Sequence, residues 1–170
     1  ALAAAEVVDD FARLPAEARP LARLEPCADR VPEPAERCRR LRALFSSARP
    51  AEGHVRLATL IKDGYFPAIF TMEPHALLAQ ALHPHFMEPG VDYKLVVLGA
   101  DPPEALHAAL QHSERDTVVK CGGDLEAGVL PLTEAELTAL LAPYETTLAE
   151  AFSVLVTFVA YVERDRPFLR

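Results

Sequence analysis

The chain has 170 residues, of which 51% are hydrophobic, and its formal net charge at pH 7 is −8. This length and composition favour a single domain with one sizeable core. The acidic balance argues against a nucleic-acid partner, since neutralising phosphates requires clustered basic residues, and no apolar run approaches the roughly 20 residues that span a membrane. The alanine-rich start is too short for a signal peptide and lacks a basic lead-in, so we expect a cytoplasmic protein.

Residues 1–50 are predicted to form a proline-rich helical arm or lid. Residues 3–14 carry apolar side chains at helical spacing, and several prolines interrupt the segment that follows. A second helix is predicted over residues 34–46. We interpret the arginines of residues 37–42 as a solvated helix face. The inward stripe of this helix is expected to comprise Ala35, Cys38, Leu41 and Phe45.

From residue 51 onward, helices and strands are predicted to alternate. Strands are predicted over residues 68–72, 93–98, 117–121 and 154–161. Helices are predicted over residues 54–63, 74–82, 105–112 and 133–141, with a further helix from about Pro143. Strands this apolar, separated by helices, indicate a parallel sheet covered on both faces.

Local signals mark several helix ends. Gly64 is expected to end the helix over residues 54–63. Asp101 is expected to be an N-cap, with Pro102 in the first turn of the next helix. Thr133 and Glu136 have the spacing of a capping box.

No metal site is expected from the cysteines and histidines. The three cysteines are odd in number and unrelated in spacing, so they indicate neither a disulfide framework nor a zinc site, and we expect Cys121 to be buried. His75, His83 and His85 are interpreted as solvent-facing loop residues, since a metal would need three or four converging ligands.

Residues 118–125 read Val-Val-Lys-Cys-Gly-Gly-Asp-Leu. This segment resembles a signature of the sirtuin-like NAD-binding family, whose bacterial branch usually reads Lys-Leu-His-Gly-Asp-Leu. Weaker likenesses follow in the family's order at residues 54–82, 131–137 and 158–167. The resemblance spans residues 54–170 and implies a Rossmann-like three-layer fold with a mostly parallel sheet, preceded by the helical arm.

The resemblance also implies that the catalytic groups of the family have been replaced. Gly122 stands at the catalytic histidine, Glu73 at the asparagine and His75 at an aspartate. Glycine has no side chain and cannot act as a general base. The family's Gly-rich phosphate loop has no counterpart, because the first glycine of the chain is Gly53. Residues 51–170 are therefore expected to be an α/β core that lacks the Gly-rich first strand and loop.

Ligands of open α/β sheets bind beyond the carboxyl ends of the strands. Asp124 and Asp165 are interpreted as caps of local structure, although an acid–base pair with Glu73 or His75 is conceivable. Cys121 would need exposure and a base to act as a nucleophile. The candidate residues of a degenerate ligand site are Thr71, Glu73, His75, Gly122, Gly123, Asp124, Tyr161 and Asp165.

Three functions remain open from the sequence. The first is a sirtuin-like pseudoenzyme that acts as an interaction or scaffolding domain of a larger bacterial defence or signalling protein, with other protein domains as partners and no cofactor. The second is a sensor of NAD, ADP-ribose or another nucleotide without turnover. The third is an NAD-consuming enzyme completed by a partner chain. The missing initial methionine suggests a piece of a longer chain, and the apolar content leaves room for a homodimer.

Overall fold

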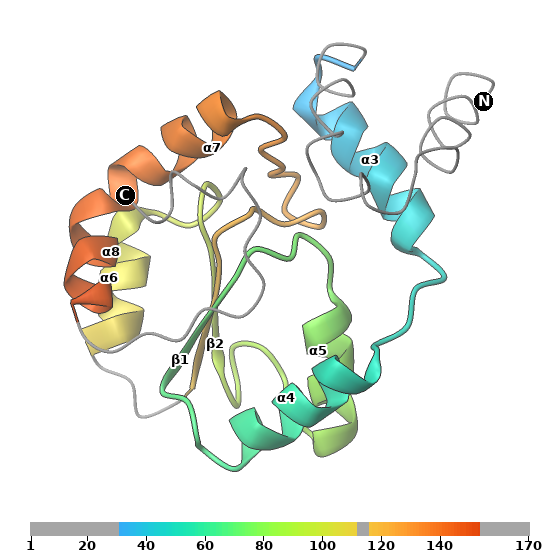
Figure 1. Cartoon of the computed structure of the whole chain (residues 1–170), viewed down its shortest axis with the longest axis vertical. Coiled ribbons are helices and arrows are strands. Elements are labelled where there is room, and N and C mark those ends of the chain that lie inside the picture. Colours follow the sequence, from blue (N-terminus) through green and yellow to red (C-terminus); the bar gives the residue numbers. More distant parts are fainter. Residues whose placement is uncertain (1–30, 112–115, 154–170) are drawn as a thin grey trace.

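A small parallel sheet lies at the centre of the structure, a computed structural model that describes residues 31–111 and 116–153 (Figure 1). Its described strands are β1 (Ala68–Thr71), β2 (Lys94–Val97) and β3 (Thr117–Lys120). Strand β3 lies between β1 and β2 and runs parallel to both. The predicted strands over residues 68–72, 93–98 and 117–121 and their parallel arrangement are confirmed, with ends that differ by one residue.

Helices pack on both faces of the sheet. The helical elements are α3 (Pro34–Phe45), α4 (Glu52–Lys62), α5 (Leu77–Leu82), η2 (His83–His85), α6 (Pro103–Gln111), α7 (Glu134–Leu141), η3 (Ala142–Tyr144) and α8 (Glu145–Phe152). The capping box is confirmed, since the Thr133 hydroxyl accepts a hydrogen bond from the Glu136 N–H at 3.1 Å. Gly64 follows the end of α4 with a φ of 73°, as expected of a residue that stops a helix.

The two faces of the sheet carry separate hydrophobic clusters. On one face, α4 and α5 pack over Val118 with Ile61, Leu82 and Tyr93. On the other face, the neighbouring Val119 packs with residues of α6, α7 and α8. Successive side chains of a strand point to opposite faces, so burial on both faces requires a continuous apolar strand. The structure therefore has three layers, with helices on both sides of the sheet (Figure 1).

Helix α3 is held on this α/β body by a buried arginine. Arg37 is 6% exposed, and its Nη1 donates to Glu136 of α7 at 2.8 and 3.0 Å. Its other donors reach the carbonyl oxygens of Val31 at 2.7 Å and Pro32 at 2.9 Å. The interpretation of residues 37–42 as a wholly solvated face was therefore wrong for Arg37. A guanidinium can be buried here because each of its three nitrogens finds an acceptor.

The inward stripe predicted for α3 is only partly correct. Cys38 is buried with Leu125, Leu130 and Leu132, and Leu41 packs at the edge of this cluster. Ala35 is exposed, and Phe45 is 37% exposed. The helix thus rests on the loop after β3 through its middle turns.

The expected cap of α6 was also wrong in detail. The helix begins at Pro103, and the Asp101 carboxylate accepts a hydrogen bond from the Val97 N–H at 2.8 Å, so it closes the turn after β2. The predicted helix over residues 3–14 and strand over residues 154–161 lie outside the described residues. None of the described helices is long and apolar enough to cross a membrane.

Candidate functional site

The connections between the strands define where a ligand would bind in this fold. The chain leaves β1 through α5 on one face of the sheet, and it leaves β3 toward α7 on the other face. Strands β1 and β3 are neighbours, so their following loops diverge at a topological switch point. In open α/β sheets the ligand crevice lies at this point, beyond the carboxyl ends of the strands. The candidate site is therefore the region between residues 71–76 and 120–125.

The crevice is closed where Gly122 meets the loop after β1. A Cβ atom built on Gly122 would lie 2.3 Å from the Met72 carbonyl oxygen and 2.9 Å from its carbonyl carbon. On Gly123, which has a φ of 84°, a Cβ would lie 2.3 Å from the Val129 carbonyl oxygen. Position 122, which the sequence resemblance pairs with a catalytic histidine, thus has no room for any side chain.

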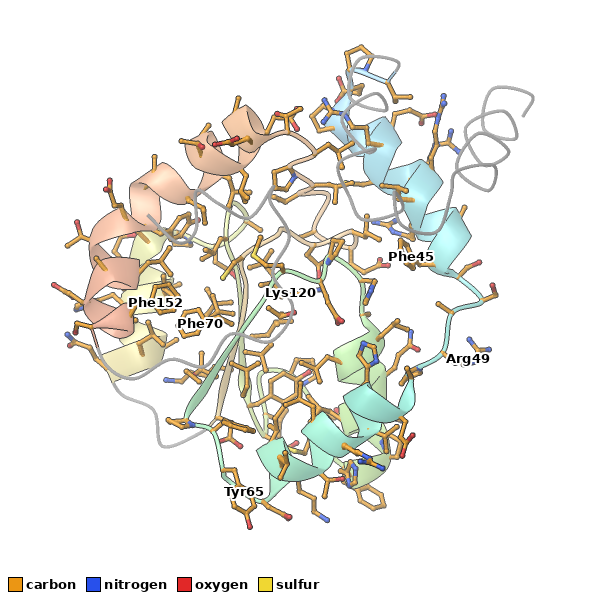
Figure 2. All side chains as sticks on the ribbon, in the orientation of Figure 1. Phe45, Arg49, Tyr65, Phe70, Lys120 and Phe152 are labelled. Carbon is orange, nitrogen blue, oxygen red and sulfur yellow. The ribbon has the colours of Figure 1, made fainter. Side chains whose placement is uncertain are left out.

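A buried ion pair fills the space beside the two glycines. Lys120 is the last residue of β3, at the upper end of the strands in Figure 2. Its ammonium group donates to the Asp124 carboxylate and, at 2.9 Å, to the His75 carbonyl oxygen. Lys120 and Asp124 are 6% and 7% exposed. Sequence reasoning missed Lys120, although a lysine within an otherwise apolar strand was a signal that it has a buried partner.

Asp124 caps the turn after β3, as its interpretation from the sequence proposed. Its Oδ1 atom accepts hydrogen bonds from the Glu126 N–H at 2.7 Å and the Ala127 N–H at 2.8 Å. Burial alone raises the pKa of the Asp124 carboxyl, but the hydrogen bonds from Lys120 and these N–H groups outweigh burial and lower the pKa. Asp124 is therefore an ionised structural group, with both oxygens engaged.

Glu73 holds the first turn of α4 through His54, a residue that sequence reasoning did not include in the site. The Nδ1 atom of His54 accepts from the Ala51 N–H at 3.2 Å, so the ring proton lies on Nε2 in the tautomer that this network assigns. Nε2 then donates to Glu73 at 3.1 Å. The Glu73 N–H donates in turn to the Thr71 hydroxyl at 3.1 Å. Both nitrogens of His54 are used, which leaves no lone pair for a general base.

His75 is not the solvent-facing residue that its sequence context indicated. Its side chain is 16% exposed, and its ring centroid lies 5.0 Å from that of Phe45 in α3. Its Nδ1 atom is buried 3.7 Å from Glu73 Oε2 and has no hydrogen-bond partner among the described residues. Burial lowers the pKa of His75, with help from Lys120 and His54, and outweighs the opposite effect of Glu73.

An open pocket of about 230 Å³ lies at the edge of this cluster, where Pro74 and His75 of the loop after β1 face Leu125 of the loop after β3. Phe45 and Arg42 of α3 line one part of it, and His75 and Gln80 line another. Arg42 already donates to the Leu125 carbonyl and lies 3.2 Å from a Glu126 carboxylate oxygen. The pocket is therefore lined by an aromatic ring, Phe45, and by His75, whereas the charge of Arg42 is already paired with Glu126.

The structure brings together every described residue of the predicted site. Tyr161 and Asp165 lie outside the described residues. Cys121 is fully buried, as expected of a core residue. Within residues 31–111 and 116–153, no group of three or more histidine, cysteine or acidic side chains is arranged to hold a metal ion. The residues that meet at the closed crevice are Thr71, Glu73, His75, Gly122, Gly123 and Asp124.

No family model, curated protein or solved structure matches the chain. The class that the structure itself defines is an α/β protein with a small parallel sheet between two helical layers. The more specific likeness to the sirtuin-like family stays a prediction from the sequence.

The lowered pKa of His75 makes stability depend on pH. The folded pKa lies below the ordinary value of 6.5, so the unfolded chain binds more protons in mildly acidic solution. The contribution of neutral His75 to the free energy of unfolding is therefore fully present above pH 6.5. It falls as the pH drops below this value, until His75 is protonated in the folded state as well. We expect the urea midpoint to fall between pH 7.5 and 5.5, and to fall less in His75→Gln. His83→Gln, at an exposed histidine, is the control and should keep the wild-type dependence; equal slopes in all three proteins would contradict this account.

Proposed function

We propose that the chain is a non-catalytic module, derived from a sirtuin-like fold, that acts through contacts with other protein domains. The resemblance in its sequence favours a bacterial defence or signalling protein as its setting. The observation that carries the proposal is the contact of Gly122 with Met72, which leaves no room for a side chain at position 122 and closes that part of the crevice.

The polar groups around this closure support the same conclusion. Asp124 and Lys120 bind each other and the backbone, and His54 uses both ring nitrogens. A general acid or base must reach a substrate proton at hydrogen-bond distance. Each of these groups is instead committed to holding a loop, which is a structural role.

Nucleotide sensing is the second candidate, and the pocket beside His75 is the observation that favours it. Phe45 and Arg42 offer chemistry that suits a base and a phosphate. The size argues against a dinucleotide, since ligand pockets usually have roughly 300–1,000 Å³ and this one has about 230 Å³. Arg42 would also have to leave Glu126 before it paired with a phosphate.

Calorimetric titration with NAD and ADP-ribose, with a parallel assay for released nicotinamide, separates these functions. An interaction module should show no heat up to millimolar ligand and no turnover. Micromolar binding that is lost in Arg42→Gln would favour the sensor. Arg56→Gln is the matched control, because Arg56 is an exposed arginine of α4 away from the pocket. Nicotinamide release that is abolished by Glu73→Ala would contradict the proposal and favour the third function, an enzyme completed by a partner chain.

A further inference from the structure

A second hollow lies at the other end of the sheet, before strand β2. Its volume is about 430 Å³, and its lining residues are His83, Pro84, Phe86, Glu88, Val91 and Asp92. We call these residues the 83–92 surface. Helix α5 starts beyond the carboxyl end of β1, and this segment leads from α5 back to the start of β2. The 83–92 surface is thus remote from the closed crevice.

Phe86 has an exposed side chain and a backbone conformation that lowers the stability of the fold. Its side chain is 90% exposed, and its backbone has a φ of 59° and a ψ of 30°. Among the described residues it is the only non-glycine with a positive φ. This left-handed position follows a helical turn, where glycine or asparagine is the residue that folding favours. An exposed ring here gains neither burial nor backbone stability, and strained residues of this kind concentrate at functional sites.

The rest of the surface is apolar in its middle and acidic at its rim. Val91 is 61% exposed, and it lines the hollow together with Phe86. Of the lining residues, Glu88 and Asp92 are acidic and none is lysine or arginine. The Asp92 carboxylate accepts from the Glu88 N–H at 2.9 Å, and the Asp92 N–H donates to the Glu88 carbonyl at 2.9 Å. This loop is therefore ordered before any partner arrives, which lowers the entropic cost of binding.

From these features we infer that the 83–92 surface binds a basic segment of a partner protein, with one apolar side chain seated between Phe86 and Val91. Lysine or arginine on either side of that anchor would meet Glu88 and Asp92. This inference rests on the proposed function and names the partner's chemistry. A second copy of the chain fits less well, because a symmetric contact would bring the same carboxylates together. An anionic membrane is disfavoured for the same reason.

The test is an NMR titration of the isotope-labelled chain with the peptide acetyl-Lys-Lys-Phe-Lys-Lys-amide, which carries one apolar side chain between lysines. We expect saturable shifts of the amides of residues 83–92, and weaker binding as salt increases. The same peptide with glutamate in place of every lysine should cause no saturable shift. Saturable shifts centred on residues 74–80, or none at all, would overturn the assignment.

Phe86→Asn is the decisive variant because it removes the ring while suiting the left-handed backbone. It should weaken peptide binding at least tenfold and raise the urea midpoint, so lost binding cannot be attributed to misfolding. Wild-type affinity in this variant would overturn the role of Phe86. Leu60→Asn changes a 39% exposed side chain of α4 outside the hollow and should leave binding unchanged. NAD turnover would refute the proposed function independently, whereas failure with the peptide refutes only this surface.

Discussion

Substitution of Gly122 by alanine should lower the free energy of unfolding by about 3 kcal/mol, at the upper end of the usual cost of overpacking. The added Cβ would lie 2.3 Å from the Met72 carbonyl oxygen. The clashing atom belongs to the backbone and cannot rotate away, so the loop after β1 must move as a whole. Urea denaturation followed by circular dichroism measures this change.

Gly53→Ala is the matched control for this prediction. Gly53 lies in the first turn of α4, and a Cβ there would meet nothing within 4 Å. Alanine favours a helix over glycine by roughly 0.5–1 kcal/mol, so this variant should be as stable as the wild type or slightly more so. A similar loss of unfolding free energy in both variants would contradict the prediction that the contact with Met72 makes Gly122 intolerant of a side chain.

The same contact bears on the origin of the proposed module. If the sirtuin-like resemblance reflects ancestry, replacing Gly122 with histidine cannot restore the ancestral site, because the crevice has closed around the glycine. We expect Gly122→His to be at least as unstable as Gly122→Ala and to release no nicotinamide from NAD.

Removal of the Lys120 ammonium should cost about 3–5 kcal/mol, because it leaves a buried carboxylate without its counter-charge. Lys120→Met keeps most of the side-chain volume and removes the donor to Asp124 and to the His75 carbonyl. Adding Asp124→Asn should recover part of the loss, since the neutral amide no longer needs a cation. The two single variants and the double variant form a mutant cycle that measures the coupling.

Glu52→Gln provides the control for a charge pair at the surface. Glu52 and Arg56 form an ion pair on α4 with side chains 78% and 77% exposed. Such pairs contribute about 0–1 kcal/mol, so this variant should unfold close to the wild-type midpoint. An effect as large as that of Lys120→Met would contradict the account based on burial.

Acid should weaken the wild type through Asp124. Its folded pKa is lowered, so the stability from its ionised form is complete above its ordinary pKa of 3.8 and is lost as the pH falls toward the folded value. Without Lys120 a main cause of this lowering disappears. The fall in stability below pH 4 should therefore be shallower in Lys120→Met than in the wild type.

The places of the strands in the chain and local hydrogen bonds explain what the sequence could predict of the candidate site. Glu73 and His75 follow one strand, and Gly122 and Asp124 follow another, so a parallel sheet had to bring them to the same edge. The role of Asp124 as a cap was also predictable, because its partners lie two and three residues away. The roles of Lys120 and His54 were not, since each depends on a residue of another loop.

Within the described residues, the sequence by itself determined the order of helices and strands and the capping box at Thr133, because periodicity and hydrogen bonds within a few residues specify them. It also indicated the parallel sheet, because its strands are apolar throughout and alternate with helices. Only the tertiary structure decided that Arg37 would be buried against Glu136, 99 residues away, and that Phe45 would cover His75. It likewise decided that Gly122 would meet Met72 and close the crevice. These contacts arise when distant segments pack together, and no local pattern in either segment records the partner that it will meet.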